Sequence, residues 1–519
     1  MKASKYKLIL FILYSTNLFS QNFLGIAGSN YAGIHSTIQN PANVVDTRQF
    51  ININLGAAGV DLQNNYVRWN APFSLFSMMS GTVSDKYKLS NGKVLWKTGD
   101  EYFKVLNQKN RADLFANGEG RGPAISIDLK KIGLGLAAGT RYRFMNSLTS
   151  TSLEVGKALV EGTQSPDLNG NLYTNRSVNF NSLYLTEYFG TIGKVIIQDE
   201  ERFIKVGGTL KYLVSNMMGN IKSSDFDFIK TADPVDTKKQ TIDFPRATGD
   251  LTIASPFPSL SISNFTSQLT AFNGIGKGVG AEIGVIYEYR PDIRKYSRNN
   301  NGKGFVDATV NKYKYKIGFS IKDIGFVNFK DPINVQTSEI NSTGTQILPG
   351  DYNRIKGIEE LIKTTGDVFN VNPASYGRAF RVYLPVTSIL TFDYQLTEKY
   401  YVNMVYRQNY LPSNRRGPIS YSGISVIPRM EKKNLELSAP LSLDNNFQNL
   451  NLGFALRYYS FFIGSDNLTG LFKLVKPRGL SIYSGISIPI YHKLPDSPLK
   501  CFTELRPIRK KKYKKARFK

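Results

Sequence analysis

The sequence has very few of the residues on which most catalytic and metal sites depend. Among 519 residues there are two histidines, His35 and His492, and one cysteine, Cys501. The histidines lie far apart and match no metal-ligand spacing, so neither a zinc site nor a Ser/His/Asp triad is indicated. A single cysteine cannot form an intramolecular disulfide. We therefore expect no enzymatic activity, no cofactor and no metal, and a fold held by its hydrogen-bonded sheet.

Long apolar runs are also missing. The apolar stretch at 8–18 (LILFILYSTNL) has about half of the ~20 residues that a membrane-spanning helix needs. It follows three lysines and precedes the small residue Ser20, which is the order of a secretory signal peptide. We predict that residues 1–20 are a signal peptide and that the mature chain begins near Gln21. The alternative is a buried N-terminal helix.

Acidic residues are scarce relative to basic ones, with 40 Asp and Glu against 66 Lys and Arg and a net charge of +26. Such a balance usually indicates nucleic-acid binding, but an exported protein seldom meets nucleic acid, so we expect no such partner. Nine of the positive charges lie in residues 506–519. A run this dense cannot pack, and residues 493–519 are predicted to form a basic tail in the periplasm.

The tail cations are candidate contacts for anionic lipid headgroups or for an acidic partner protein. A solvated tail without a partner is the alternative. The candidate contact residues are Arg509, Lys510, Lys511, Lys512, Lys514 and Lys515.

The body of the chain alternates apolar and polar residues with a period of two. Residues 203–214, 279–290 and 312–322 each place charged side chains on one face and apolar side chains on the other. About ten residues in this pattern span a membrane as a tilted strand, whereas strands of soluble sheets usually have five or six. The pattern favours a transmembrane antiparallel β-barrel over a soluble β-sandwich, which is the alternative.

Turn signals divide the body into about fourteen strands. Short turns are expected near 130–133, 198–201, 396–399, 430–433 and 458–460, and longer connections near 68–121, 147–178, 217–277 and 329–379. The expected strands are 51–67, 122–130, 134–146, 182–196, 203–216, 278–290, 312–326, 380–395, 400–411, 418–429, 434–442, 449–457, 461–467 and 480–491.

Short turns of bacterial barrels face the periplasm, so both ends of the barrel and the connection at 291–311 are expected there. Two segments of the outer connections, 152–161 and 355–368, have helical spacing. They are expected to be helical insertions, either as surface helices or as caps over the barrel mouth.

Three parts of the sequence resemble those of known outer-membrane barrels. The segment 25–45 leads into Asn40, Pro41, Ala42 and Asn43, and this stretch resembles the N-terminal signature of FadL-type barrels, which include the PorV-like barrels of Bacteroidota. The segment 319–327 (FSIKDIGFV), in which Asp323, Ile324 and Gly325 close a strand, resembles a second element of these families. Residues 462–472 and 479–491 resemble a poorly characterised Bacteroidota family of outer-membrane barrels.

The resemblance covers most of residues 22–492 and implies a fourteen-strand barrel with its N-terminal segment folded into the lumen. Asn-Pro is a turn former, so we interpret the Asn40–Asn43 motif as architecture and assign it no ligand role. The expected protein is all-β and lies in the cell outer membrane. Its expected divisions are a signal peptide at 1–20, a lumenal or plug segment at 21–49, a barrel at 50–492 and a basic tail at 493–519.

Two functions fit this barrel. In the first, it is a docking or scaffold subunit of envelope machinery, as the PorV-like barrels are in type IX secretion, and it contacts other envelope proteins through its outer loops and tail. In the second, it is a FadL-like conduit for hydrophobic small molecules. The lysine-rich face of 312–322 suits a plugged or protein-bound lumen better than an apolar one, so the scaffold is the first hypothesis.

Overall fold

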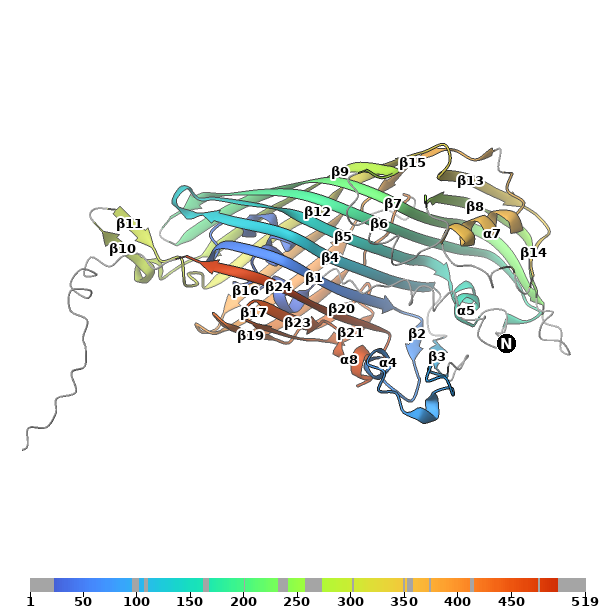
Figure 1. The fold of residues 1–519 in the computed structure, drawn as a ribbon, viewed down its shortest axis with the longest axis horizontal. Helices are drawn as coiled ribbons and strands as arrows, with labels where there is room; N and C mark the ends of the chain where they lie inside the picture. The colour runs from blue at the N-terminus through green and yellow to red at the C-terminus, as the bar shows by residue number, and fades with distance from the viewer. Residues whose placement is uncertain are drawn as a thin grey trace, which may run out of the picture.

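The alternating segments form the wall of one closed antiparallel barrel in the computed structural model (Figure 1). The barrel closes because β1 (Gln49–Asn64) pairs with β24 (Gly479–Tyr491) on one side and with β4 (Arg111–Leu129) on the other. The structure describes residues 23–95, 102–106, 111–161, 168–199, 201–231, 241–256, 273–300, 303–348, 351, 358–372, 375–410, 415–474 and 477–492.

The wall has fourteen strands when collinear pieces are counted together, which confirms the prediction. After β1 and β4 the order around the barrel is β5 (Leu134–Ser152), β6 (Leu172–Gln198), β7 (Arg202–Thr231), β9 (Gly276–Tyr289), β12 (Tyr315–Lys330), β15 (Ala379–Tyr383) with β16 (Thr387–Gln395), β17 (Tyr400–Asn409), β18 (Gly423–Lys432), β19 (Leu435–Ser438) with β20 (Leu441–Asp444), β21 (Asn449–Leu452) with β22 (Phe454–Tyr458), β23 (Phe461–Ser465) and β24.

All five predicted short turns lie at one end of the barrel, which we call the short-turn end. The first wall residue, Gln49, pairs with Tyr491 there, so the first strand begins and the last strand ends at this end. The connection between β9 and β12 also lies there, as predicted. It carries η7 (Ile293–Tyr296) and a hairpin of β10 (Ser297–Asn300) and β11 (Lys303–Val306), which projects at the left of Figure 1. The opposite end is the long-loop end.

The predicted long connections at 147–178 and 217–277 are wrong in part, because strands occupy much of them. β6 has 27 residues and β7 has 30, well beyond the membrane-spanning length. At the long-loop end β7 pairs with β8 (Thr241–Ala254), which pairs with β13 (Val335–Ser342) and β14 (Thr345–Ile347). Buried aromatic side chains such as Phe226, Phe228 and Phe244 form an apolar core on this sheet, which stabilises it beyond the barrel.

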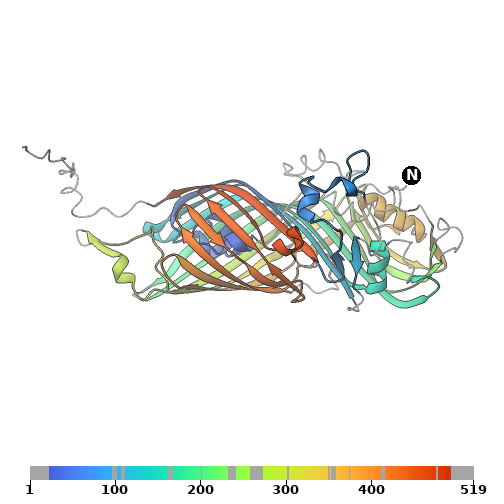
Figure 2. The ribbon, with the colours of Figure 1, turned by 90° about the horizontal axis from the view of Figure 1, so that it is seen from below.

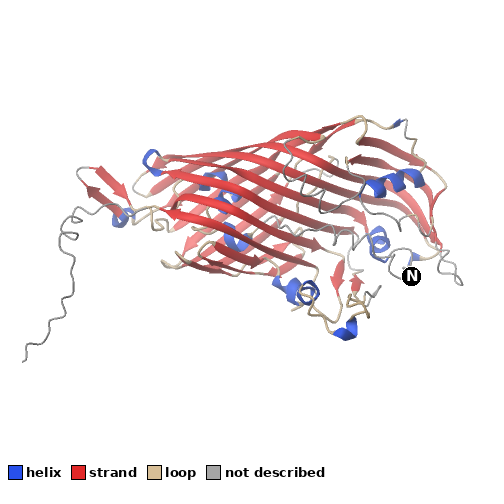
Figure 3. Cartoon of the chain, viewed as in Figure 1, coloured by secondary structure: helices blue, strands red, loops and turns tan. Residues whose placement is uncertain are grey.

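The two predicted helical insertions are present at the long-loop end as α5 (Leu153–Glu161) and α7 (Ile358–Val368), coloured blue in Figure 3. Smaller elements complete the loops. They are β2 (Val67–Trp69), α4 (Leu75–Met79), η2 (Asp85–Tyr87), β3 (Phe103–Val105), η4 (Lys130–Ile132) and α8 (Leu468–Phe472).

The outer face of the wall is apolar while the inner face is polar. Leu210, Ile192 and Ile283 are more than half exposed on the outer face, whereas Thr209 and Glu282, their neighbours in sequence, are buried in the lumen. This alternation is the one that a barrel wall presents to lipid. Among the described residues, no helix has both the length and the apolar character needed to cross a membrane.

Aromatic side chains mark the edge of the apolar face near the short-turn end. Tyr315 stacks on Tyr289 at 5.2 Å between ring centroids and on Phe392 at 6.2 Å, and Phe392 stacks on Tyr394 at 6.5 Å. Aromatic rings of this kind form the girdles at the two interfaces of membrane barrels.

Candidate functional site

The lumen contains the N-terminal part of the described chain. α2 (Leu24–Ala27), α3 (Ile34–Gln39) and η1 (Pro41–Val44) lie inside the barrel, where the blue helices of Figure 2 are enclosed by the wall strands. Most of their side chains are buried. The predicted N-terminal lumenal segment is therefore confirmed, and we call residues 23–48 the plug.

The start of the plug is bonded to the last wall strands. Asp466 accepts a hydrogen bond from the backbone N–H of Leu24 at 3.1 Å and another from the hydroxyl of Tyr483 at 2.9 Å. The Tyr483 hydroxyl in turn accepts the N–H of Gly25 at 3.1 Å. The ring of Phe23 stacks on the ring of Tyr483, with 4.8 Å between centroids. These contacts place the first turn of the plug against β24.

His35 connects the middle of the plug to two wall strands. Arg121 donates a hydrogen bond to its Nδ1 at 2.8 Å, so the proton of a neutral ring lies on Nε2, which is 3.1 Å from the hydroxyl of Ser487. Burial, together with the charge of Arg121, lowers the pKa of His35 well below its usual value. The ring of His35 is therefore neutral between its two hydrogen-bond partners.

The Asn40–Asn43 motif forms the end of the plug. The side chain of Asn40 accepts the backbone N–H of Ala42 at 3.0 Å, which caps η1, and Pro41 occupies the first position of that helix. The same carboxamide donates to the carbonyl oxygens of Val285 at 3.3 Å and Phe319 at 3.2 Å, on β9 and β12. Asn40 thus shapes the plug and attaches it to the wall.

The Asn40–Asn43 motif packs against a row of glycines in the wall. Gly135, Gly193, Gly207 and Gly284 lie directly opposite one another on four successive strands, from β5 to β9. A Cβ at Gly207 would lie 2.4 Å from the carbonyl carbon of Pro41, and one at Gly284 would lie 2.1 Å from Oδ1 of Asn40. Only glycine lets the plug backbone approach this closely. This glycine row was not predicted, although glycines at corresponding positions of consecutive expected strands are a signal that the sequence contains.

Asp323 lies at a bulge in the middle of β12, so the prediction that Asp323, Ile324 and Gly325 close a strand is wrong. The pairing with β9 shifts register between Ile321 and Ile324, and Asp323 has a φ of 58°. The bulge turns the carboxylate of Asp323 into the lumen, where Arg143 lies 2.8 Å and Lys211 3.0 Å from it. β-Bulges commonly redirect a side chain in this way.

Ile324 and Gly325 occupy different environments beside this bulge. Ile324 is 42% exposed on the outer face of the wall. A Cβ at Gly325 would lie 2.5 Å from the carbonyl oxygen of Val279, so this glycine permits close strand packing after the register shift.

The middle of the lumen is filled by buried ion pairs, both within single strands and between neighbouring ones. Glu119 lies 2.6 Å from both Arg121 and Arg141, and Lys211 lies 2.6 Å from Glu282. Further pairs join Arg143 to Glu187 at 2.8 Å and Arg429 to Glu431 at 2.6 Å. The inward-facing charges predicted from the alternation are therefore paired across the wall and around the plug.

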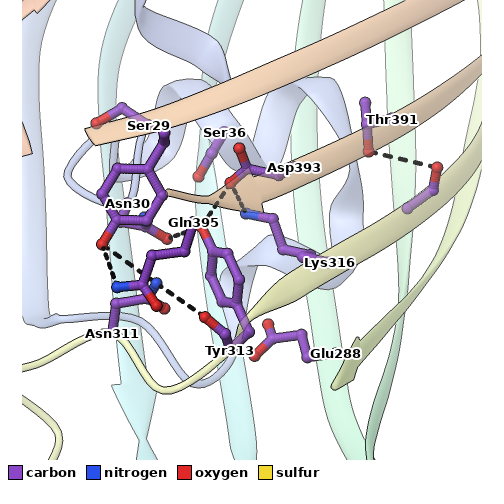
Figure 4. A network of polar contacts seen from close by, with 12 residues as sticks. Ser29, Asn30, Ser36, Glu288, Asn311, Tyr313, Lys316, Thr391, Asp393 and Gln395 are labelled. Atoms are coloured by element: carbon purple, nitrogen blue, oxygen red, sulfur yellow. Dashed lines mark hydrogen bonds and ion pairs between the residues drawn. The ribbon is translucent and has the colours of Figure 1, made fainter. Parts of the chain in front are cut away.

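A second polar network holds the plug near the short-turn end (Figure 4). Asp393 on β16 receives two hydrogen bonds of 2.7 Å from Arg429, and Lys316 lies 3.7 Å from it. The hydroxyl of Tyr313 bonds the same carboxylate and lies 3.0 Å from Oδ1 of Asn30 in the plug. The Asn30 side chain donates to Glu431 at 3.0 Å. Three wall strands and the plug thus share one network.

Two small spaces border the plug. One of about 40 Å³ lies between α2, α3 and the wall around Ile389 and Arg407, and one of about 50 Å³ lies near Asp46 and Lys312. Each has room for a few water molecules.

On β7 and β12 the inner face becomes apolar toward the long-loop end. Leu213 follows Lys211 on the same face of β7, and Val327 and Phe329 follow Asp323 on β12. These side chains join a buried apolar cluster that includes Leu384. On these two strands the inner face therefore has a charged middle part and an apolar outer part, whereas β1 carries the buried polar residues Asp61 and Gln63 at the same end.

The outer face of the wall contains a recess of about 530 Å³, which we call the wall recess. It crosses β4, β5, β6, β7 and β9, where Ala138, Gly190, Gly208 and Ala281 leave space between larger apolar side chains. Its lining is Ile125, Ile127, Leu136, Ala137, Ala138, Gly190, Thr191, Ile192, Gly208, Thr209, Leu210, Ala281, Glu282 and Ile283. The recess lies on the same strands as the glycine row.

Several predicted features lie outside the described residues. These are the signal peptide at 1–20 and the tail at 493–519 with its candidate contact residues. His492 lies at the short-turn end with its Nε2 3.1 Å from a carboxylate oxygen of Asp128. Within the part of the chain that the structure describes, no group of three or more His, Cys, Asp or Glu side chains could hold a metal ion.

Solved structures with a similar fold are outer-membrane proteins of very low sequence identity. The toluene transporter TbuX of Ralstonia pickettii is 8% identical, with 90% of this chain and 97% of that chain covered and a TM-score of 0.37. The toluene transporter TodX of Pseudomonas putida is 10% identical, with 91% and 98% covered and a TM-score of 0.35. A FadL homologue of Pseudomonas aeruginosa is 11% identical, with 92% and 99% covered and a TM-score of 0.29.

Proteins of the FadL type are thus among the solved structures that resemble this chain. The PorV-like and Bacteroidota assignments stay predictions. No curated protein matches the sequence. The model of one family matches residues 41–466, from Pro41 in the plug to Asp466 beside its first turn. The chain belongs to this family, which is described as a family of unknown function, DUF5723.

Proposed function

We propose that this protein is an outer-membrane barrel that passes small apolar molecules into the bilayer through its wall. This was the second hypothesis from the sequence, and the wall recess is the observation that carries it. An apolar hollow of about 530 Å³ that opens on the lipid side gives an apolar molecule a place at the boundary between barrel and membrane.

The composition of the wall supports an opening at this place. The glycine row on the inner side and the small residues of the wall recess on the outer side lie on the same strands, β5 to β9. Glycine adds no side-chain packing to a sheet and weakens it locally. A wall built this way separates lumen and lipid by little more than its backbone.

The plug is the gate in this proposal. It occupies the lumen beside the glycine row, and the spaces around it hold only a few waters. An apolar molecule that entered the lumen along the apolar cluster of β7 and β12 would meet the plug and the buried ion pairs. Passage to the wall recess therefore requires the plug to shift.

Filling the wall recess tests the proposal. A Cβ at Gly190 meets no atom within 4 Å, so Gly190→Leu has open space at its Cβ and adds bulk to the recess. Gly56→Leu is the matched control, because a Cβ at Gly56 on β1 also meets no atom within 4 Å and lies outside the recess. In cells that depend on this protein, uptake of a fluorescent fatty acid is expected to fall with Gly190→Leu and to stay unchanged with Gly56→Leu. Equal uptake by both variants and the native protein would sink the proposal.

The scaffold hypothesis keeps one specific observation in its favour. The plug is bonded to wall strands on several sides of the barrel, through Asp466, His35, Asn40 and Asn30. A lumen closed in this way suits a subunit whose role is to bind other envelope proteins, including those of type IX secretion. Isolation of the tagged protein from native membranes tests it, since a scaffold is expected to bring stoichiometric envelope proteins with it and a conduit is not.

The placement of the chain is part of the same proposal. A signal peptide at 1–20 exports the chain, the barrel lies in the outer membrane with its short-turn end in the periplasm, and the basic tail at 493–519 lies in the periplasm. Protease added to intact cells is expected to leave an epitope at the C-terminus uncut.

A further inference from the structure

The outer face of the wall carries a cluster of cations at the long-loop end. Lys277 on β9, Lys330 on β12, Arg381 on β15 and Arg415 after β17 are exposed, and we call these four residues the basic patch. Lys277 and Arg381 both lie opposite Asn328, on its two neighbouring strands. Directly paired residues point to the same face, so these side chains form one row across three strands.

The basic patch lies where the apolar face of the wall ends. On β9, Ile283 and Val279 are more than half exposed on the outer face, and the next outward side chain after Val279 is Lys277. On β12 the outward series runs from Ile324 through Phe326 to Asn328 and Lys330. Along both strands the outward side chains change from apolar to polar and cationic near the long-loop end. Such a change marks the interface between hydrocarbon and headgroups.

Aromatic rings at this boundary orient two of the cations. The guanidinium of Arg381 lies 4.2 Å from the ring centroid of Phe326, and that of Arg415 lies 4.7 Å from the centroid of Tyr383. Nε of Arg381 also donates to Asn328 at 2.8 Å. These contacts hold the guanidinium groups while leaving the side chains exposed to a ligand.

Within the described part of the chain, none of these four cations forms an ion pair with a carboxylate. Lys277 bonds the side-chain oxygen of Asn273 at 3.3 Å. The nearest carboxylate along the sequence, Asp331, accepts the backbone N–H groups of Ile333 and Asn334 at 2.8 and 2.7 Å. This differs from the lumen, where the cations lie against carboxylates. The positive charge of the basic patch is therefore not neutralised by carboxylates of the described chain.

We propose that the basic patch binds the phosphate groups of a phosphorylated glycolipid in the outer leaflet of the outer membrane, with the acyl chains of that lipid lying on the apolar face below. Lys and Arg both bind phosphate, and Arg does so through a planar pair of donors. A ligand that carries phosphates and acyl chains on one molecule can bind the basic patch and the apolar face at the same time. The inference goes beyond the transport proposal and rests only on the placement of the barrel in the outer membrane.

Equilibrium binding of lipid A to the full-length protein in detergent micelles tests the inference. Each cation near an anionic lipid surface contributes about fivefold to affinity, so Lys277→Gln with Arg381→Gln is expected to weaken binding about 25-fold. The matched control is Lys131→Gln with Lys194→Gln, which removes two exposed lysines at the short-turn end and is expected to leave binding unchanged. Lys330→Gln alone is expected to weaken binding about fivefold.

Each other outcome overturns the inference. Unchanged affinity in the double variant removes the basic patch as the site, and an equal loss in the control shows a general attraction to basic surfaces. Equally tight binding of lipid A without its phosphates shows that the acyl chains alone bind. Displacement of lipid A by equimolar inorganic pyrophosphate assigns the site to free phosphate. Heat-modifiable migration of each variant on gels verifies that the barrel has folded, and fatty-acid uptake is measured separately.

Discussion

The side-chain carboxamide of Asn40 forms three hydrogen bonds, one within the plug and two to the wall, so its substitution tests how the plug is held. Asn40→Asp keeps the acceptor for the N–H of Ala42 but loses both donors to Val285 and Phe319. Two buried carbonyl oxygens then face a carboxylate, so the free energy of unfolding in urea is expected to fall by about 2–3 kcal/mol. The control, Asn43→Asp, loses one half-buried bond to Ser36 and is expected to cost about 1 kcal/mol or less. Equal losses would contradict this role for Asn40.

Gly284 shows how one missing side chain positions the plug. In Gly284→Val, the new Cβ would overlap Oδ1 of Asn40, so the end of the plug is expected to leave the wall. Limited proteolysis should then cut the plug at least tenfold faster than in the native protein. Gly190→Val is the control, since Gly190 lies on β6, two strands from Gly284 in the same part of the wall, and has open space at its Cβ. A protected plug in Gly284→Val would show that the close approach to glycine is not required.

At the scale of elements, the bulge of β12 links backbone conformation to buried charge. Asp323→Asn preserves a residue that tolerates positive φ but removes the charge that neutralises Arg143 and Lys211. Loss of one partner from a buried ion network is expected to cost about 3–5 kcal/mol of unfolding free energy. Asp323→Ala should cost more, because alanine disfavours the left-handed conformation. The exposed-loop control Asp331→Asn should change stability by less than about 1 kcal/mol, and a comparable loss there would argue against the network.

The strands were predictable where the alternation of apolar and polar residues was strict. β9 and β12 carry apolar residues outward and charges inward over most of their length, as far as the change of pattern near the long-loop end, and both were predicted within a few residues. The extension of β6 and β7 was not, because their outer halves face a protein core and no longer alternate against lipid. The expected strand at 434–442 appears as β19 and β20, because Pro440 interrupts the ladder between them.

The plug site was predictable only in part for a similar reason. The Asn40–Asn43 motif indicated a turn before the first strand, and the inward lysines of 312–322 indicated a filled lumen. The partners of these residues, such as Val285 for Asn40 and Asp393 for Lys316, lie more than 70 positions away in the sequence. These contacts depend on the register in which the strands of the barrel pair, and a local sequence pattern does not determine that register.

For the whole molecule, the central question is whether the plug moves, because the conduit requires it and the scaffold does not. A Cβ at Gly28 in the plug would lie 3.2 Å from Cγ of Asn403 on β17. In a cysteine at position 403, the sulfur atom would take the place of this Cγ. Gly28→Cys with Asn403→Cys, in a Cys501→Ser background, is therefore expected to form a disulfide between plug and wall. Oxidation should abolish fatty-acid uptake and dithiothreitol should restore it, while the amounts of co-purifying envelope proteins stay unchanged.

The single variants Gly28→Cys and Asn403→Cys control for the substitutions themselves, and both should transport equally with or without reductant. Uptake that continues in the fully oxidised double variant would show that transport, if present, does not need the plug to leave the wall. Loss of co-purifying proteins on oxidation would instead tie plug movement to partner binding. The tether thus separates the two functions in one protein, because it blocks a motion without removing any wall strand or long loop that a partner could contact.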